Sequence, residues 1–376
     1  TLAGAMGDRA LVVDLADPAG STAAITALAA RQPLDAVVAV DDQGVLIAAL
    51  AGQELGLAAN DPQAVARTRN KAAMRAALAA AGPRGGGPVR QPAFRVVSRD
   101  GDVVAAAEQV GWPVVVKPIS LSASRGVIRA DDPAGARAAA ARVWAILDGD
   151  CHPAAEPLLV EAYVPGEEVA VEALLRAGRL EVLAIFDKPD PLTGPYFEET
   201  LYVTPSRLPA AVQAEISGAV GQAAAAIGLT EGPVHAELRI DPEGRPWMLE
   251  LAARTIGGLC ARTLRFAAGV TLEELVLRHA LALPLDPRRE DFAAGVMMLP
   301  ISRSGRLVAV RGQDEARAVP GVTALEISIL PDRDVRPLPE GDRYLGFLFA
   351  RASTPAGVEA ALRAAHAHLE VEIAPT

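Results

Sequence analysis

The sequence predicts a protein of the α/β and α+β classes, with an N-terminal parallel sheet followed by a small and then a larger α+β unit. Three observations predict this class. The chain has 376 residues, 51% of them hydrophobic, which is enough for two or three packed subdomains. Strand-like and helix-like patterns alternate over residues 1–60, which is typical of parallel strands joined by crossover helices. Further along, apolar strands are followed by hairpin patterns.

The N-terminal unit is predicted from "ALVVDLAD", an Ala-rich segment, "LDAVVAVDD" and "VLIAALAGQELGL". The next stretch, "NDPQAVARTRNKAAMRAALAAAG", predicts one helix with Asn60 or Asp61 as N-cap, Pro62 in the first turn and an end at Gly82-Pro83. We expect "GPRGGGP" to be a flexible connector. The first domain is therefore predicted to cover residues 1–88.

The second unit is predicted to open at "WPVVVKP" and to close at "PLLVEAYV", with an Ala/Arg-rich helix between them. We expect it to cover residues 89–165, and a larger α+β unit to cover residues 166–376. The uncharged stretch 216–230 is Ala/Gly-rich, so it predicts a buried helix and not a membrane span.

Composition excludes several classes of function. The formal net charge of −10 argues against a nucleic-acid partner but allows a nucleotide in a locally basic cleft. Cys151 and Cys260 are far apart and lack metal-ligand spacing, which argues against disulfides and zinc and favours a reducing cytoplasm. The first ten residues show neither an initiating Met nor a signal-peptide pattern, so we expect part of the native start to be missing.

The stretch "HAELRIDPEGRPWMLELAAR" (235–254) predicts a hairpin with two opposed carboxylates. If Glu243-Gly244 is a two-residue turn, Glu237 pairs with Glu250. Strand alternation then predicts which side chains share their face: His235, Arg239, Met248, Ala252 and Arg254. Like charges facing each other repel, and a divalent cation between them reverses the penalty. The alternative is a solvated pair relieved by a nearby arginine.

Two further motifs carry possible ligand contacts. In "VVVKPISLSASRGV", a buried strand delivers Lys117, and the small residues of the loop 120–126 allow backbone N–H groups to approach phosphates. In "LLVEAYVPGEEVAVEALL", the chain bends at Pro165-Gly166, where backbone could pair with an adenine edge and Glu168 could accept ribose hydroxyls. A snorkelling surface lysine and a hairpin with solvated glutamates are the alternatives.

The order of these motifs resembles the ATP-grasp superfamily from about residue 35 to the C-terminus. "KPDPLTGPYFEETLYVTPSRLP" and "GDRYLGFLFARASTP" are most similar to the L-amino acid ligases, which are carboxylate-amine ligases. The resemblance implies an ATP-grasp fold with a pre-ATP-grasp domain, a lid subdomain (89–165) and a C-terminal catalytic subdomain with a ligase-type extension. It implies ATP and Mg²⁺ as cofactors, expected as two metal ions, with Mn²⁺ as the alternative.

The resemblance also assigns roles to individual residues. Arg254, Glu237, Glu250 and Lys117 are the implied catalytic residues, and Glu237 and Glu250 the metal ligands. The implied ATP contacts are Lys71, Lys117, the lid-loop residues Ser122, Ser124, Arg125 and Gly126, the adenine hinge Glu161, Ala162, Tyr163 and Val164, the ribose contact Glu168, and Lys188. The implied substrate contacts are His235, Glu199, Arg254, Gly257 and Gly258.

Two positions depart from the superfamily pattern. Many ATP-grasp enzymes have Asn two residues after the second metal-binding Glu, whereas this chain has Ala252, as the amino acid ligases do. The lid loop has one glycine, Gly126, where many relatives have two or three, which puts lid flexibility in doubt.

The predicted function is activation of an amino acid carboxylate as an acyl phosphate, which an amine then attacks to give a dipeptide or amide. Small-molecule substrates and a homodimer are the expected partners, with no nucleic acid and no membrane. A purine-pathway ligase, a biotin carboxylase-like enzyme and a non-catalytic nucleotide sensor are the alternatives.

Overall fold

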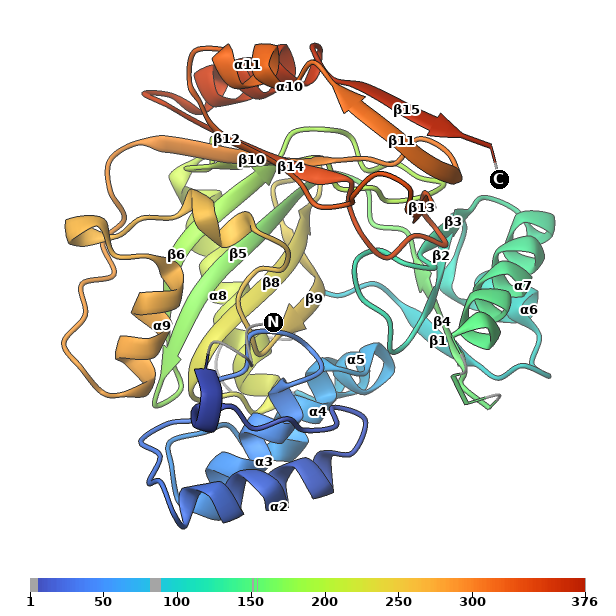
Figure 1. Ribbon diagram of the computed structural model, residues 1–376. Helices are drawn as coiled ribbons and strands as arrows, with labels where there is room; N and C mark the ends of the chain where they lie inside the picture. Colours follow the sequence, from blue (N-terminus) through green and yellow to red (C-terminus); the bar gives the residue numbers. More distant parts are fainter. Residues whose placement is uncertain (1–5, 82–88, 151, 154, 376) are drawn as a thin grey trace.

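The computed structural model describes residues 6–81, 89–150, 152–153 and 155–375. The predicted connector 82–88 and Cys151 lie outside the described residues. Figure 1 shows the N-terminal helices below a large central sheet, the subdomain 89–165 beside it, and the C-terminal segment above it. Among the described residues, none of the helices is both long and apolar enough to cross a membrane.

The N-terminal region consists of helices and loops, and the predicted parallel sheet is a wrong prediction for its described part. It contains a 3₁₀ turn η1 (Gly7–Arg9), α2 (Pro18–Ala29) and α3 (Val45–Leu55), and no strand is assigned between residues 6 and 81. In the segments expected to be strands, Val12 and Val40 are 85% and 83% exposed. Within residues 6–81, apolar alternation thus occurs without a neighbouring strand to pair with.

The single helix predicted after Pro62 is divided in two. Helix α4 (Pro62–Thr68) is capped by Asp61, whose carboxylate accepts from the backbone N–H groups of Gln63 and Ala64. Helix α5 (Lys71–Ala80) is capped separately by Asn70. Because this second cap satisfies the backbone of a new first turn, the helix restarts at Lys71.

Residues 89–165, the predicted lid subdomain, contain a four-stranded antiparallel sheet with the order β1-β4-β2-β3. Its strands are β1 (Phe94–Val97), β2 (Val114–Pro118), β3 (Ile128–Ala130) and β4 (Leu158–Ala162). Helices α6 (Val103–Val110) and α7 (Pro133–Gly149) cover it and share an apolar core with β2 and β4. The strand that carries Lys117 is therefore held in the middle of a small packed layer.

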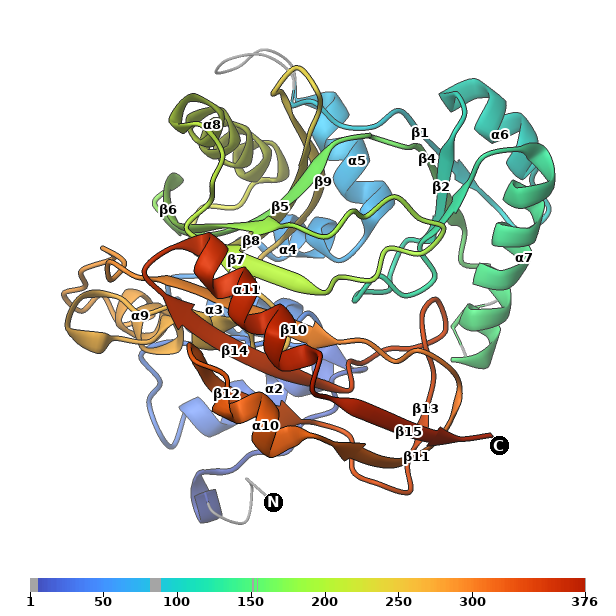
Figure 2. The same cartoon turned by 90° about the horizontal axis from the view of Figure 1, so that it is seen from above.

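The central sheet has eight antiparallel strands in the order β12-β14-β10-β7-β6-β5-β8-β9. They are β5 (Glu167–Arg176), β6 (Arg179–Lys188), β7 (Leu201–Thr204), β8 (Gly232–Ile240), β9 (Pro246–Ala252), β10 (Ala293–Leu299), β12 (Val322–Ile327) and β14 (Gly346–Ala352). Helices α8 (Ala210–Ile227) and α11 (Pro355–His366) pack on different parts of it (Figure 2).

The two faces of this sheet have different neighbours. Along β5, Val169, Val171 and Ala173 belong to the core that contains α8, whereas Ala170 and Leu174 point to the opposite face. That opposite face packs against the 3₁₀ turn η2 (Cys260–Thr263) and helix α9 (Leu272–Ala280), which are joined through a second 3₁₀ turn, η3 (Ala267–Gly269). Because Glu168 alternates with Val169, it also points away from α8.

The β8-β9 hairpin pairs Glu237 with Glu250, as predicted, but its turn and its register differ from the prediction. The turn is longer than two residues: the N–H of Asp241 donates to Arg245 O, and that of Gly244 donates to Asp241 O. A register shift between Glu237 and Leu238 compensates, so that Leu238 pairs with Met248.

This β-bulge corrects the predicted faces of two residues. Met248 lies in the core with Leu238, whereas Leu249 points into a cavity beside Glu250. A bulge inserts one unpaired residue into one strand and thereby exchanges the faces of its neighbours.

The C-terminal segment adds helix α10 (Gln313–Ala318) and a three-stranded antiparallel sheet, β13-β11-β15. Its strands are β11 (Gly305–Arg311), β13 (Asp334–Val335) and β15 (Glu370–Ala374). The loop after β13 contacts the subdomain 89–165: Gly126 N–H donates to Pro339 O at 3.0 Å, and Arg142 forms a bidentate pair with Glu340 at 2.6 and 2.9 Å.

Candidate active site

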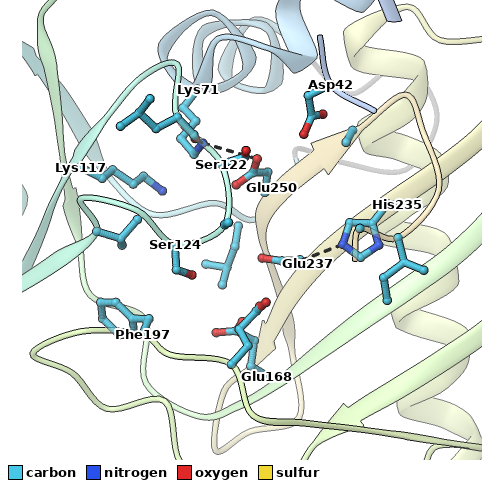
Figure 3. A pocket seen from close by; sticks show the side chains of 18 of the residues that line it. Asp42, Lys71, Lys117, Ser122, Ser124, Glu168, Phe197, His235, Glu237 and Glu250 are labelled. Atoms are coloured by element: carbon cyan, nitrogen blue, oxygen red, sulfur yellow. Dashed lines mark hydrogen bonds and ion pairs between the residues drawn. The ribbon is translucent and has the colours of Figure 1, made fainter. Parts of the chain in front are cut away.

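A cavity of about 500 Å³ lies between the subdomain 89–165, the central sheet and the N-terminal region. Figure 3 shows side chains from all three parts pointing into it. It brings together most of the sequence-predicted site residues: Lys71, Lys117, Ser122, Ser124, Glu161, Ala162, Tyr163, Val164, Glu168, Glu199, His235, Glu237, Glu250, Arg254, Gly257 and Gly258. It does not include Arg125, Gly126 or Lys188.

One end of the cavity is cationic. Lys71 Nζ donates to Leu121 O at 2.6 Å and lies 3.4 Å from Glu250 Oε1. Lys117 Nζ lies 2.6 Å from Glu161 Oε2, while Arg75 Nε binds Oε1 of the same carboxylate at 2.6 Å. A single buried carboxylate therefore serves two cations, which leaves this end suited to an anion.

The pKa values at this end follow from the shared carboxylate. Burial would raise the pKa of Glu161, but Arg75 and Lys117 together lower it to about 2. Burial lowers the pKa of Lys117; Glu161 opposes this, and the neighbouring cations Arg75 and Lys71 add to it. A polyphosphate would supply the negative charge that Lys117 lacks here.

Only part of the lid loop (120–126) faces the cavity. Ser122 and Ser124 line it, and Ala123 and Ser124 both have φ of 55°, in the left-handed region. Arg125 points elsewhere: its guanidinium pairs with Asp150 and donates from Nε to Glu340 O at 3.0 Å. The predicted ATP contacts Arg125 and Gly126 instead contact the α7 end and the C-terminal loop in this structure.

The predicted adenine hinge, residues 161–164, forms the wall at the end of β4. Tyr163 stacks against Phe197 with ring centroids 6.4 Å apart. The guanidinium of Arg239 lies 4.9 Å from the Tyr163 ring and donates to Val164 O at 2.7 Å. Arg239 thus fixes both a flat aromatic surface and the hinge backbone.

Next to the hinge, three carboxylates gather around one lysine. Oxygens of Glu168, Glu199 and Glu237 lie within 4.8 Å of one another. Lys188 Nζ binds Glu168 at 2.7 Å, lies 3.4 Å from Glu237 and contacts Glu199. Lys188 therefore lies beneath the cavity wall as a counterion, and Glu168 is held by Lys188 and Arg239.

Burial and the neighbouring charges together set the pKa values in this cluster. Burial raises the pKa of Glu199 to about 7; Lys188 opposes the rise, and Glu237 and Glu168 add to it. Burial would lower the pKa of Lys188, but Glu168 and Glu199 raise it well above its ordinary value. The lysine therefore stays charged, and the pKa of the Glu199 carboxyl lies near neutral pH.

Glu237 and Glu250 face each other across β8 and β9 and both line the cavity. Their partners differ, because Glu237 lies 3.5 Å from His235 Nε2, whereas Glu250 lies beside Lys71 (Figure 3). Opposed carboxylates at the edge of a cationic cavity form a donor set that suits a hard cation such as Mg²⁺.

His235 is held by a carboxylate on the neighbouring strand. Its Nδ1 lies 2.5 Å from Glu172 Oε1, and Glu172 Oε2 accepts from the N–H of Ile256 at 3.1 Å. Burial would lower the pKa of His235, but Glu172 raises it to about 9. The imidazolium and the loop that follows Arg254 are thus tied to the same carboxylate.

Arg254 points into the cavity with its guanidinium held by Asp42. Its Nε and Nη2 bind the two Asp42 oxygens at 2.9 and 2.8 Å, and Nη1 donates to Thr255 O at 2.9 Å. Burial would lower the pKa of Arg254, but Asp42 raises it. Gly257 and Gly258 follow along the same wall.

Three side chains that line the cavity or hold its lining residues are not among the predicted site residues: Asp42, Arg75 and Arg239. Asp42 ends the run "VVAVDD", and an acidic residue directly after an apolar run is a recognisable signal for a site. Arg239 shares the predicted face of Glu237, where it is expected only as an arginine that could relieve the repulsion between Glu237 and Glu250. Arg75 lies inside a helix pattern with no local signal.

Comparison with known families agrees with this geometry. The model of the ATP-grasp domain family matches residues 110–263, and that of the ATP-grasp N-terminal domain matches residues 3–58. The chain therefore contains ATP-grasp domains. Its last part is more specific, because the family L-amino acid ligase C-terminal domain 2 matches residues 297–374.

Individual relatives are distant but cover most of the chain. The crystal structure of L-amino acid ligase from Bacillus licheniformis superposes with a TM-score of 0.77 at 25% identity, covering 95% of this chain and 85% of that one. The uncharacterized protein y4rH of Sinorhizobium fredii is 27% identical over 84% of this chain and 63% of its own length. Alanine–anticapsin ligase of Bacillus subtilis is 28% identical over 65% of this chain and 53% of its own. The chain thus spans under two thirds of the length of these two curated relatives.

Proposed function

We propose that this chain is an ATP-dependent carboxylate-amine ligase that activates an amino acid carboxylate and joins it to an amine, giving a dipeptide or amide, ADP and phosphate. One observation carries the proposal. A single cavity places the cationic pair Lys71 and Lys117, the opposed Glu237 and Glu250, and Arg254 around one space. The L-amino acid ligase-type C-terminal domain favours this reaction over the purine-pathway and biotin carboxylase-type alternatives.

Phosphate binding falls to the cationic end. Lys71 and Lys117 hold the phosphates, with backbone N–H groups of the lid loop above them, while Tyr163 and Phe197 provide an apolar surface for the base. Glu237 and Glu250 would hold Mg²⁺, which when bound neutralises charge on the phosphates.

The acyl transfer depends on positioning. Arg254 lies where it can stabilise negative charge as a carboxylate oxygen attacks the γ-phosphate and ADP leaves. Glu199 and His235, with the backbone at Gly257 and Gly258, line the part of the cavity left for the amino acid and the amine. The amine then displaces phosphate from the acyl phosphate. A closed lid subdomain excludes water, which would otherwise hydrolyse this intermediate. A cytoplasmic homodimer stays a prediction.

The test is phosphate release from Mg·ATP with the twenty amino acids, singly and in pairs. We expect release to depend on a particular pair, to be accompanied by ADP and a new amide, and to fall by at least 100-fold in Glu250→Ala. Glu243→Ala, on the exposed turn of the same hairpin, serves as the matched control and keeps activity. Nucleotide binding without release across the panel would contradict the amino acid ligase and favour another carboxylate substrate or a nucleotide sensor.

A further inference from the structure

Asp42 reaches the cavity from the loop between α2 and α3, 212 residues before the arginine that it binds. Both of its carboxylate oxygens accept from Arg254, at 2.9 and 2.8 Å. Such a bidentate pair fixes the plane of the guanidinium as well as its position. The loop itself is anchored, because Asp41 Oδ1 accepts from the N–H of Gly44 at 2.8 Å.

Two N–H groups of the Arg254 guanidinium remain available to bind a ligand. A guanidinium has five N–H donors, and three of them bind Asp42 and Thr255 O. One N–H therefore remains on each terminal nitrogen, which suits two oxygens of a tetrahedral anion. The side chain of Arg254 is only 12% exposed, so water competes little for these donors.

Arg254 hydrogen-bonds to Asp42 although two other carboxylates are near enough to attract it. Glu250 and Glu172 both act electrostatically on Arg254. Without Asp42, the guanidinium would be free to turn toward Glu250, which is needed as a metal ligand in the proposed mechanism.

We propose that Asp42 is a positioning residue, which acts through Arg254 and through which the N-terminal domain completes the active site. The proposal rests on the proposed ligase function. Asp42 touches neither reacting group; it sets the angle at which Arg254 meets the transferring phosphate. The N-terminal domain is then part of the catalytic unit and more than a scaffold beside it.

The test is the isosteric change Asp42→Asn, which removes the charge and turns one acceptor into a donor. With the amino acid pair that supports turnover, we expect kcat to fall about 30-fold while the KM for ATP stays within about threefold, because the change misplaces a group that acts in the transition state. In an Arg254→Lys background the same change should alter kcat by less than about threefold, because the fork is already lost.

Asp148→Asn is the matched control, since Asp148 forms a bidentate pair with Arg99 on the surface of the lid subdomain. It should leave kcat unchanged. An equal loss from Asp42→Asn in both backgrounds would overturn the proposal, and so would an effect confined to the KM of the amine, which would place Asp42 directly on the substrate.

A second readout does not depend on turnover. The Nε–H of Arg254 should give a slowly exchanging NMR signal, identified by its loss in Arg254→Lys, and Asp42→Asn should speed its exchange at least tenfold. Unchanged exchange would overturn the positioning role even if no substrate is found. If no amino acid pair supports phosphate release but Asp42→Asn still speeds exchange of the Arg254 Nε–H, the proposed amino acid ligase function is contradicted. The Asp42–Arg254 pairing is then supported independently of that function.

Discussion

Arg75 offers the sharpest test of how the site is held together. Its side chain is completely buried, and it donates to three acceptors on two other elements: Glu161 Oε1 at 2.6 Å, Met248 O at 3.1 Å and Leu249 O at 2.7 Å. The perturbation is Arg75→Met, which keeps much of the volume and removes every donor.

The magnitude follows from what is left behind. Removing one partner of a buried ion pair costs about 3–5 kcal/mol, and the lower figure applies because Glu161 keeps Lys117 as a partner. Two buried carbonyl groups, of Met248 and Leu249, lose their donors at about 1 kcal/mol each or more. The sum is about 5 kcal/mol, a third or more of the stability of a typical protein.

The assay is the midpoint of thermal unfolding, with Arg99→Met as the control. At roughly 2 °C per kcal/mol for a long chain, Arg75→Met should lower the midpoint by about 10 °C. Arg99 also pairs with a carboxylate, that of Asp148, but on the surface, and its substitution should leave the midpoint unchanged. A fall of less than about 2 °C in Arg75→Met would refute the reasoning, because it would show that the buried carboxylate and carbonyls find other partners.

Two further predictions concern the lid subdomain and acid. Arg142 and Glu340 form an ion pair between side chains that are 41% and 36% exposed. Glu340→Ala should therefore remove about 0.5–1 kcal/mol of closed-lid stability and speed ADP release about two- to fivefold in stopped-flow measurements, whereas the control Asp148→Ala should not. An unchanged release rate in Glu340→Ala would show that this contact does not hold the lid. Because the folded pKa of Glu161 is about 2, below its ordinary 4.5, its contribution is present above pH 4.5 and is lost as pH falls toward 2. The deficit in unfolding midpoint of Glu161→Gln relative to the native protein should therefore be largest at neutral pH and shrink below pH 4.5; a deficit independent of pH would contradict the paired carboxylate.

Local patterns predicted the parts of the site that depend on local geometry. Glu237 and Glu250 were found because a hairpin brings close sequence neighbours together, and Lys117 because a buried strand ends in a loop of small residues. Asp42 and Arg75 were missed because their partners lie up to 212 residues away, and no spacing along the chain encodes such a contact.

Other errors have equally specific causes. Alternation around Val12 and Val40 predicts a strand but says nothing of whether a second strand is available to pair with it. The second helix cap at Asn70 is a readable signal that the continuous apolar pattern concealed. Met248 was assigned to the wrong face because a bulge breaks the two-residue period that the prediction assumed.

The bulge in β9 has a consequence for how this hairpin can vary in evolution. The turn after Asp241 and the extra residue near Leu249 shift the pairing in opposite directions, so Glu237 meets Glu250 only because both are present. At the present spacing between the two glutamates, closing the bulge alone would pair Glu237 with Leu249 and turn Glu250 to the other face of the sheet. A relative that keeps this spacing between the two glutamates but has lost the bulge should therefore also have a two-residue turn.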